Sequence, residues 1–458
     1  MDRGEERAPA GGAGQGGAPA VRAANADRWR RTYWVVWIAN LVTSIGMMSF
    51  LPFFPSLLEE MGVADEGRRS VWAGVCFAAA PLSATISAPV WGAVGDRFGR
   101  KVMVCRAMAA IALFVGSMGF ASSPWQLLAL RLGQGMFSGF IPPSITLVSI
   151  AAPEDRQGRV AGNLGTALAI GGLVGPLLGG LLANALGSRQ AVFFVVASLA
   201  TISAFIVWFG AEEDRSLRRT GGAPSSGKPV RDAFKRLSSD LAEVFAQPAM
   251  RAMALVVFSL QFGLGAVNPI LELYIQGLFE GDLRGTFWAR VVGLLGAGEG
   301  DLEKQVETFT TALSFGAMAV ANLVSLPLWG AWGDRVGHAR ALAQCGGIAA
   351  LALVIQAATS SYGVFLAGRF LMGVGMAGIG PLAFGLAAGE ARADRRGGAF
   401  GVVFSARTFA VAVGGTSGGL LYTLLEARGL MVLAALLVLG TLVGFRRSSA
   451  ARAAASSG

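Results

Sequence analysis

Residues 89–101 read PVWGAVGDRFGRK, and residues 327–339 read PLWGAWGDRVGHA. The two stretches share eight identical residues at a constant separation of 238, counted from Pro89 to Pro327. A motif repeated at one fixed separation indicates that the chain is an internal duplication. Each copy ends an apolar run with glycines and opposite charges, which predicts a short turn between two membrane helices at the water interface.

The composition favours a membrane protein. The chain has 458 residues, 53% of them hydrophobic and 14% charged, with a mean hydropathy of +0.57, whereas a soluble domain carries about 25% charged residues. Apolar stretches recur that are long enough to cross about 30 Å of hydrocarbon, which takes about 20 residues of helix. We therefore expect an all-α polytopic protein embedded in a lipid bilayer.

The basic residues predict orientation. A net charge of +10 can indicate nucleic-acid binding, but the Lys and Arg residues are spread over alternate loops, so we expect no nucleic-acid partner. With the N-terminus inside, 28 of the 38 basic residues fall on the inner side and 7 in outer loops. This bias predicts a multi-pass protein of the cell (inner) membrane with both termini cytoplasmic. Cys76, Cys105 and Cys345 lie in apolar segments and are predicted to pack without a disulfide.

Twelve spans are expected in two halves of six. The predicted spans are 33–58, 72–94, 102–121, 125–150, 160–186, 191–209, 253–278, 309–332, 341–359, 364–388, 400–425 and 430–445. The predicted domains are a disordered cytoplasmic tail (1–30), a six-helix half (31–211), a cytoplasmic linker (212–250), a second six-helix half (251–446) and a cytoplasmic tail (447–458).

Two connections have features of their own. Apolar residues recur on one helical face over residues 234–245 of the linker, which predicts an amphipathic helix on the inner membrane surface. Pro52 matches Pro269 at a separation of 217, whereas the loop motifs are 238 apart. The second half therefore has 21 additional residues between Pro269 and its copy of the motif. We place them in an outer loop insertion over residues 279–308, whose apolar run 288–297 is too short to span. It is either a plain insertion or a lid over the substrate path.

Twelve helices in two related halves with this duplicated loop resemble the major facilitator superfamily. The residues that match the family's loop motif between the second and third helices are Gly92, Asp96, Arg97, Gly99, Arg100 and Lys101. The resemblance implies the major facilitator fold, in which this loop braces the inner ends of the two halves and helps gate the outward-facing state.

The second copy of the motif is less complete. It keeps Asp334 and Arg335 as gate residues, but His338 and Ala339 replace the basic pair of the first copy, which predicts a weaker gate. Capping of helix ends is the alternative explanation for the aspartate of each copy.

Residues 171–180 read GGLVGPLLGG, which resembles the motif that marks the drug:proton antiporter branch of that superfamily. Gly171, Gly175 and Gly179 fall four apart on one helical face, which allows close approach of a neighbouring helix. Pro176 removes a backbone hydrogen bond and bends the span, and Gly180 completes the motif. The eleventh span has GGTSGG at 414–419 without proline. The exporter branch shows this one-sided pattern, and the first half, notably residues 72–106, resembles bacterial multidrug-resistance exporters.

Two intramembrane charges are candidates for proton coupling. Arg131, followed by Gln134, resembles the superfamily's intramembrane arginine motif, and the equivalent arginine is implicated in proton transfer in proton-coupled relatives. The alternative for Arg131 is a hydrogen bond between helices. The first span has no carboxylate, unlike several drug antiporters, so Glu272 of span seven is the best intramembrane acid. A buried carboxylate can exchange protons near neutral pH; the alternative places Glu272 at the outer interface.

Polar residues within the spans are candidates to line a substrate cavity: Asn40, Gln134, Gln261, Asn268 and Arg407. An unpaired charge at the depth of Arg407 is costly, so we expect it to bind Glu272, an anionic substrate or a helix carbonyl.

The sequence therefore predicts a monomeric secondary transporter that exports amphipathic small molecules or drugs by proton antiport with alternating access. One alternative is a carrier for a specific anionic metabolite or siderophore, which Arg407 would bind. A second is an uncoupled transporter-like sensor or lipid-handling scaffold, which the acid-free first span permits. The single histidine lies in a loop and no nucleotide-binding loop occurs, so we expect no enzyme activity, cofactor or metal.

Overall fold

A computed structural model of the chain describes residues 18–151, 157–213, 247–279, 287–294, 302–390 and 396–457. The regular structure in these ranges is helical throughout, as predicted. The amphipathic helix predicted at residues 234–245 lies outside them.

The first half of the chain contains α1 (Ala18–Phe50), η1 (Leu51–Phe53), α2 (Phe54–Glu60), α3 (Glu66–Phe98), α4 (Arg100–Met118), α5 (Pro124–Phe137), α6 (Ile141–Ala151), α7 (Gln157–Leu186) and α8 (Arg189–Gly210). The second half contains α10 (Pro248–Val267), η4 (Asn268–Ile270), α11 (Leu271–Leu278), α12 (Phe287–Leu294), α13 (Leu302–Val336), α14 (His338–Ala358), α15 (Tyr362–Ala377), α16 (Ile379–Glu390) and α17 (Arg396–Ser457). Here η1 and η4 are single 3-10 turns.

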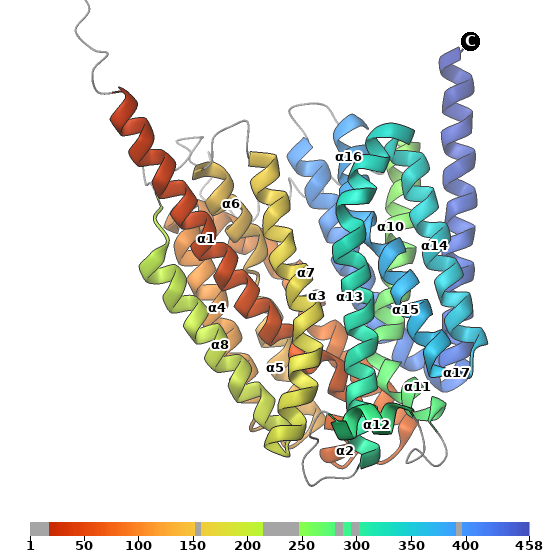
Figure 1. The fold of residues 1–458 in the computed structure, drawn as a ribbon. Coiled ribbons are helices and arrows are strands. Elements are labelled where there is room, and N and C mark those ends of the chain that lie inside the picture. The colour runs from red at the N-terminus through yellow and green to blue at the C-terminus, as the bar shows by residue number, and fades with distance from the viewer. Residues whose placement is uncertain are drawn as a thin grey trace, which may run out of the picture.

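These helices account for twelve crossings. Ten helical segments of the described chain are long and apolar enough to span a membrane. One of them belongs to α17, which turns back on itself at Glu426 (φ 56°, ψ −179°) and so crosses twice (Figure 1). The remaining crossing is made by α5 followed by α6. The crossings of the two halves form two bundles that lie side by side, the first in red to yellow-green and the second in green to blue (Figure 1).

Prolines interrupt the spans at equivalent places in the two halves. Pro52 lies in η1 and Pro269 in η4, so each first span of a half is broken by the same 3-10 turn. This confirms that these two prolines correspond. Spans four and ten, which we predicted as continuous, are broken as well, between α5 and α6 and between α15 and α16. The reason is local: Pro142 and Pro381 fall in the first turns of α6 and α16, where proline suits a helix start but not a helix interior.

Both ends of the chain are more helical than expected. The disordered tail predicted over residues 1–30 is corrected for residues 18–30, because α1 begins at Ala18. Likewise α17 continues through the predicted C-terminal tail to Ser457. Both segments are rich in Ala and Arg, which have high helix propensity and extend an existing helix without a new nucleation cost. The two described ends lie on the same side of the molecule, here called the termini end; the other side is the opposite end (Figure 1).

The insertion before the eighth span folds onto the opposite end. It contains α12, whose eight residues are too few to span, as predicted. Ala289 and Val292 of α12 pack against Val306 of α13. The helix α13 begins at Leu302, earlier than the predicted Phe309, because its first turns are held by this contact.

Each half has a hydrophobic core of its own. Cys76, Cys105 and Cys345 are buried and free, which confirms their packing role.

The duplication extends to single hydrogen bonds. The indole N–H of Trp91 donates to the carbonyl oxygen of Met136 at 2.7 Å. The indole N–H of Trp329 donates to the carbonyl oxygen of Val374 at 2.8 Å. Both the donors and the acceptors of these two bonds are 238 positions apart, so the two motif copies are held to their bundles in the same way.

Candidate functional site

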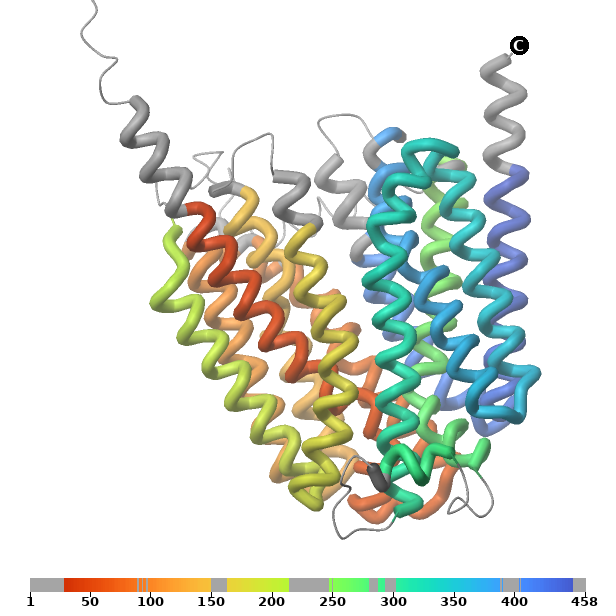
Figure 2. Tube along the Cα trace, in the orientation of Figure 1, coloured from red at the N-terminus to blue at the C-terminus, as the bar shows by residue number. Residues whose placement is uncertain are grey.

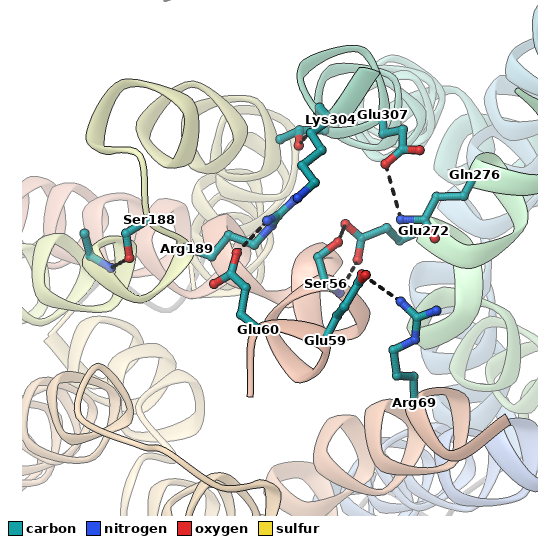
Figure 3. A network of polar contacts seen from close by, with 12 residues as sticks. Ser56, Glu59, Glu60, Arg69, Ser188, Arg189, Glu272, Gln276, Lys304 and Glu307 are labelled. Atoms are coloured by element: carbon teal, nitrogen blue, oxygen red, sulfur yellow. Dashed lines mark hydrogen bonds and ion pairs between the residues drawn. The ribbon is translucent and has the colours of Figure 1, made fainter. Parts of the chain in front are cut away.

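The two halves touch at the opposite end, where α11 lies against α2. Glu272, in the first turn of α11, is 1% exposed. Its carboxylate accepts hydrogen bonds from the backbone N–H of Ser56 at 3.0 Å and from the Ser56 hydroxyl at 2.5 Å. Ser56 belongs to α2 and is itself 4% exposed, so both bonds join one half to the other (Figure 3). Glu272 therefore lies near the end of its span, as the alternative at the outer interface predicted, but its side chain is buried between the two halves.

Ion pairs surround this contact. Arg69 binds Glu59 at 2.7 Å, and Arg189 binds Glu60 at 2.6 Å (Figure 3). Both arginines thus make their direct ion pairs with other acids, while Arg189 also acts on Glu272 electrostatically from a longer distance. In the part of the chain that the structure describes, Glu272 has hydrogen-bond donors from the other half but no ion pair within 4.0 Å.

A second contact between the halves joins α3 to α17. A Cβ built on Gly74 would lie 2.2 Å from the carbonyl oxygen of Gly415 and 3.2 Å from the backbone of Gly419. Only glycine lets the two helices come this close. Further along the same two helices, in the first turn of α3, the carboxylate of Glu66 accepts a hydrogen bond from the Tyr422 hydroxyl of α17.

The third contact, between α7 and α13, shows that the halves diverge toward the termini end. A Cβ built on Gly180, near the opposite end, would lie 3.4 Å from Thr308. On Gly172 it would lie 4.0 Å from Ala319, and on Gly165, nearest the termini end, it would have no neighbour within 4 Å. The tube view shows α7 in yellow and α13 in teal moving apart in this direction (Figure 2). Along this pair of helices, the halves touch at the opposite end and are apart toward the termini end.

The glycine face of α7 packs on α1. Cβ atoms built on Gly171, Gly175 and Gly179 would lie 2.4, 2.6 and 1.9 Å from atoms of α1. For Gly179 that atom is the backbone oxygen of Ser49. The predicted close approach of a neighbouring helix is confirmed, and α7 continues as a helix through Pro176.

Arg131 is held by neighbouring helices. It is 2% exposed, and its Nε donates to the carbonyl oxygen of Cys76 at 3.0 Å. Nη1 donates to the Gln134 amide oxygen at 2.6 Å, and Nη2 to the carbonyl oxygen of Phe77 at 3.3 Å. The bonds to Cys76 and Phe77 of α3 agree with the alternative given above for Arg131, a hydrogen bond between helices.

Arg369 repeats this arrangement in the second half. It is 1% exposed, and its Nε donates to the carbonyl oxygen of Ser314 at 3.4 Å. Ser314 is the counterpart of Cys76, 238 positions later. The guanidinium also donates to the Asn268 amide oxygen at 3.4 Å, so this cavity candidate serves as an arginine partner.

Two further cavity candidates pair with each other. In the amide orientation that satisfies both groups, Gln261 of α10 accepts from Nη2 of Arg407 at 3.2 Å and from Nε at 3.0 Å. A Cβ built on Gly380 of α16 would lie 3.3 Å from Nη1 of the same guanidinium. Among the described residues, the hydrogen-bond partner of Arg407 is thus the Gln261 amide and not the Glu272 carboxylate. The remaining candidate, Asn40, accepts from the Ser144 hydroxyl at 3.1 Å and joins α1 to α6.

The loop motif forms the same turn in both copies, as predicted. Gly99 joins α3 to α4 with φ 104°, and Gly337 joins α13 to α14 with φ 91°. Residues other than glycine rarely adopt these angles. The backbone N–H groups of Arg100 and Lys101 donate to the two carboxylate oxygens of Glu213 at 2.7 and 3.2 Å. Glu213 follows α8 and thus caps the start of α4, a role that its place among linker charges did not reveal.

The other charges of the motif are only partly described. The side chains of Asp96 and Arg97 lie outside the described residues. In the second copy, the carboxylate of Asp334 lies 3.7 Å from Nε2 of His338 one turn later, and Arg335 is exposed. Among the described residues, no group of three or more His, Cys, Asp and Glu side chains is placed to hold a metal ion.

Comparisons with known proteins agree on one family. Residues 36–300 and 302–457 match the model described as Major Facilitator Superfamily. Multidrug resistance protein MdtG of Proteus mirabilis is 31% identical over 353 residues, which are 76% of this chain and 78% of the relative. The uncharacterized MFS-type transporter YuxJ of Bacillus subtilis is 31% identical over 347 residues, 76% of this chain and 80% of the relative.

Solved structures share the fold. The human organic anion transporter MFSD10 (TETRAN) aligns with a TM-score of 0.64 at 19% identity, covering 91% of this chain and 99% of that one. A bacterial homolog of the human lysosomal transporter Spinster, inward-facing and occupied, aligns with a TM-score of 0.68 at 12% identity, covering 91% and 96%.

Proposed function

Because this chain belongs to the Major Facilitator Superfamily, we propose that it is a secondary active transporter that exports amphipathic small molecules from the cytoplasm by proton antiport. Relatives that are 31% identical are named multidrug resistance proteins, which supports substrates of this kind. The chain is a multi-pass membrane protein; we place it in the inner membrane as a monomer, with the termini end toward the cytoplasm, as the distribution of basic residues favours.

The observation that carries the proposal is the burial of Glu272 at the closed end. Its carboxylate is the hydrogen-bond acceptor through which α11 holds α2 of the other half. A carboxylate that takes part in the contact between halves is placed to couple its own proton to their movement.

The coupling follows from desolvation. When the opposite end closes, Glu272 leaves water, and burying an ionised carboxylate without a cation in direct contact is costly. A proton on Glu272 removes that cost. The Ser56 hydroxyl can donate or accept, so the contact holds with the proton-bound acid as well. A proton taken up from outside then favours the state that is open to the cytoplasm, where substrate enters between the diverging halves. For antiport, this proton has to leave Glu272 to the cytoplasm before the opposite end reopens with substrate bound.

We propose that the loop motif closes the termini end in the other state. A Cβ built on Gly92 or on Gly330, its counterpart, would have no neighbour within 4 Å. These surfaces are therefore uncovered while the termini end is open. The clamp of Glu213 on the start of α4 keeps the first motif copy in position for this closure.

Proton movement in proteoliposomes tests the proposal. The purified full-length chain is reconstituted, a proton gradient is imposed, and lipophilic cations, neutral compounds and anions are added in turn. We expect the wild type to release the gradient when a transported compound is added, and Glu272→Gln to abolish this release. Glu303→Gln, which changes an exposed acid at the start of α13, is the matched control and should behave as the wild type.

Three other results of this experiment would contradict the proposal. Release that persists in Glu272→Gln would remove Glu272 from the coupling. Release confined to one anionic metabolite would favour the specific carrier. A wild type that responds to no compound would favour the uncoupled scaffold over antiport.

A further inference from the structure

Arg407 lies where the two halves have separated. On α3, Ala78 would be 3.2 Å from a Cβ built on Gly415 of α17, so the halves touch at this level. One and two turns closer to the termini end, Leu82 and Ile86 of α3 are 37% and 62% exposed. The two helices are antiparallel, so two turns along α17 from Gly415 lead to Arg407. The guanidinium is therefore at the level of Leu82 and Ile86 along α3.

The charge of Arg407 is not neutralised by the protein. Its described hydrogen-bond partner, Gln261, is a neutral amide. Within the described residues no acidic side chain forms an ion pair with it. A guanidinium within a membrane span is costly unless it meets an anion or water. The described part of the chain thus keeps an arginine toward the termini end and offers it no acidic side chain.

Gln261 and Gly380 fix how this arginine is presented. Gln261 engages Nε and Nη2, which holds the planar guanidinium in one orientation against α10. On the side of Nη1, α16 comes close at Gly380, where an added Cβ would lie 3.3 Å from this atom. Arg407 is half-buried, and a planar guanidinium held in one orientation is suited to a carboxylate, sulfonate or phosphate oxygen.

We propose that Arg407, oriented by Gln261, binds the acidic group of the exported molecule, so that the substrates are amphipathic anions whose apolar part rests on Leu82 and Ile86. The inference rests on the proposed function and narrows its substrate class. It assigns separate tasks to the two unmatched charges: Glu272 carries the proton at the closed end, and Arg407 holds the substrate in the open half.

Equilibrium binding to the purified full-length protein tests the site. Three fluorescent probes share one apolar body: dansylaminoundecanoic acid, its methyl ester and the corresponding dansylated primary amine. We expect the wild type to bind the acid more tightly than the ester or the amine. Arg407→Gln should weaken binding of the acid about tenfold to a hundredfold, the range for a lost hydrogen bond to a charged group. Binding of the ester should change by less than about twofold, within the usual effect of a change that removes no contact.

Two variants separate this effect from misfolding. Arg407→Lys retains the positive charge and should keep the preference for acid over ester, although with weaker binding because the bidentate geometry is lost. Arg447→Gln makes the same chemical change at an exposed position of α17 and should bind all three probes as the wild type does.

The outcomes distinguish the site from the transport proposal, because binding is measured without a proton gradient. The site is overturned if the wild type does not bind the acid, binds the three probes equally, or prefers the amine. It is also overturned if Arg407→Gln weakens acid and ester alike. Acid-selective binding that depends on Arg407, in a protein that moves no protons, would support the site and refute the antiport.

Discussion

Replacing Gly179 by alanine tests whether the glycine face of α7 serves helix packing. The new Cβ would lie 1.9 Å from the backbone oxygen of Ser49, 2.6 Å from its carbonyl carbon and 2.8 Å from its Cα. No rotamer can relieve an overlap with three backbone atoms, so α1 and α7 must move apart by about 1 Å. Overpacking of this kind costs about 3 kcal/mol at the upper end of its range. Alanine regains about 1 kcal/mol of helix propensity, so we expect a net loss of about 2 kcal/mol.

Thermal unfolding in detergent, followed by tryptophan fluorescence, measures the effect. Gly165→Ala is the matched control, because it lies on the same helix and its Cβ would meet nothing within 4 Å. Only the gain in helix propensity applies there, so its midpoint should equal or exceed that of the wild type. A midpoint for Gly179→Ala as high as that of Gly165→Ala would refute the packing argument.

Two further predictions concern residues found only in the structure. Ser56→Ala removes the hydroxyl partner of Glu272 and should shift the equilibrium toward an open opposite end by about twofold to tenfold, since a hydrogen bond between neutral groups, as with the proton-bound acid, contributes about 0.5–1.5 kcal/mol. Spin-label distances between α2 and α11 report this shift, and an unchanged distribution would contradict it. Glu213→Ala leaves the first N–H groups of α4 without their acceptor and should cost about 0.5–2 kcal/mol. The unfolding midpoint measures that loss, and Glu213→Gln, which keeps one acceptor oxygen, should lose less.

The sequence predicts the architecture well because the bilayer leaves few choices. Backbone groups in hydrocarbon must be satisfied within the segment, so each apolar stretch of sufficient length has to be a helix. The repeated motif fixed the pairing of the halves, and the structure has the same positive φ at Gly99 and Gly337. The close packing of α7 was also predictable, because glycines four apart expose backbone on one face.

The site was harder to predict, because it depends on contacts between distant segments. Ser56 and Glu272 are 216 positions apart, and nothing in the surroundings of Ser56 marks it as a partner for an acid. Their contact forms only because α2 and α11, one from each half, pack together at the opposite end. Glu213 was missed for a different reason. It lies among linker charges, and its task becomes visible only when the end of α8 is seen beside the start of α4.

The duplication supplies an internal control for the charges within the membrane. Arg131 and Arg369 occupy equivalent positions, and Nε of each donates to the backbone carbonyl at the equivalent place in its half. A charge retained in both halves with the same backbone bond is explained by its packing role, which favours a structural task for Arg131.

Glu272 and Arg407 have no such counterpart. The position equivalent to Glu272, 217 residues earlier as for the matched prolines, is Pro55. The position equivalent to Arg407, 238 residues earlier as for the loop motif, is Ala169. A charge within the membrane is costly. Because the other half folds without a charge at the equivalent position, we attribute each of these two charges to function and not to stability. One of these charges lies at the contact that closes the molecule, and the other lies where the molecule is open. A proton that moves one way and an anion that moves the other would account for both positions.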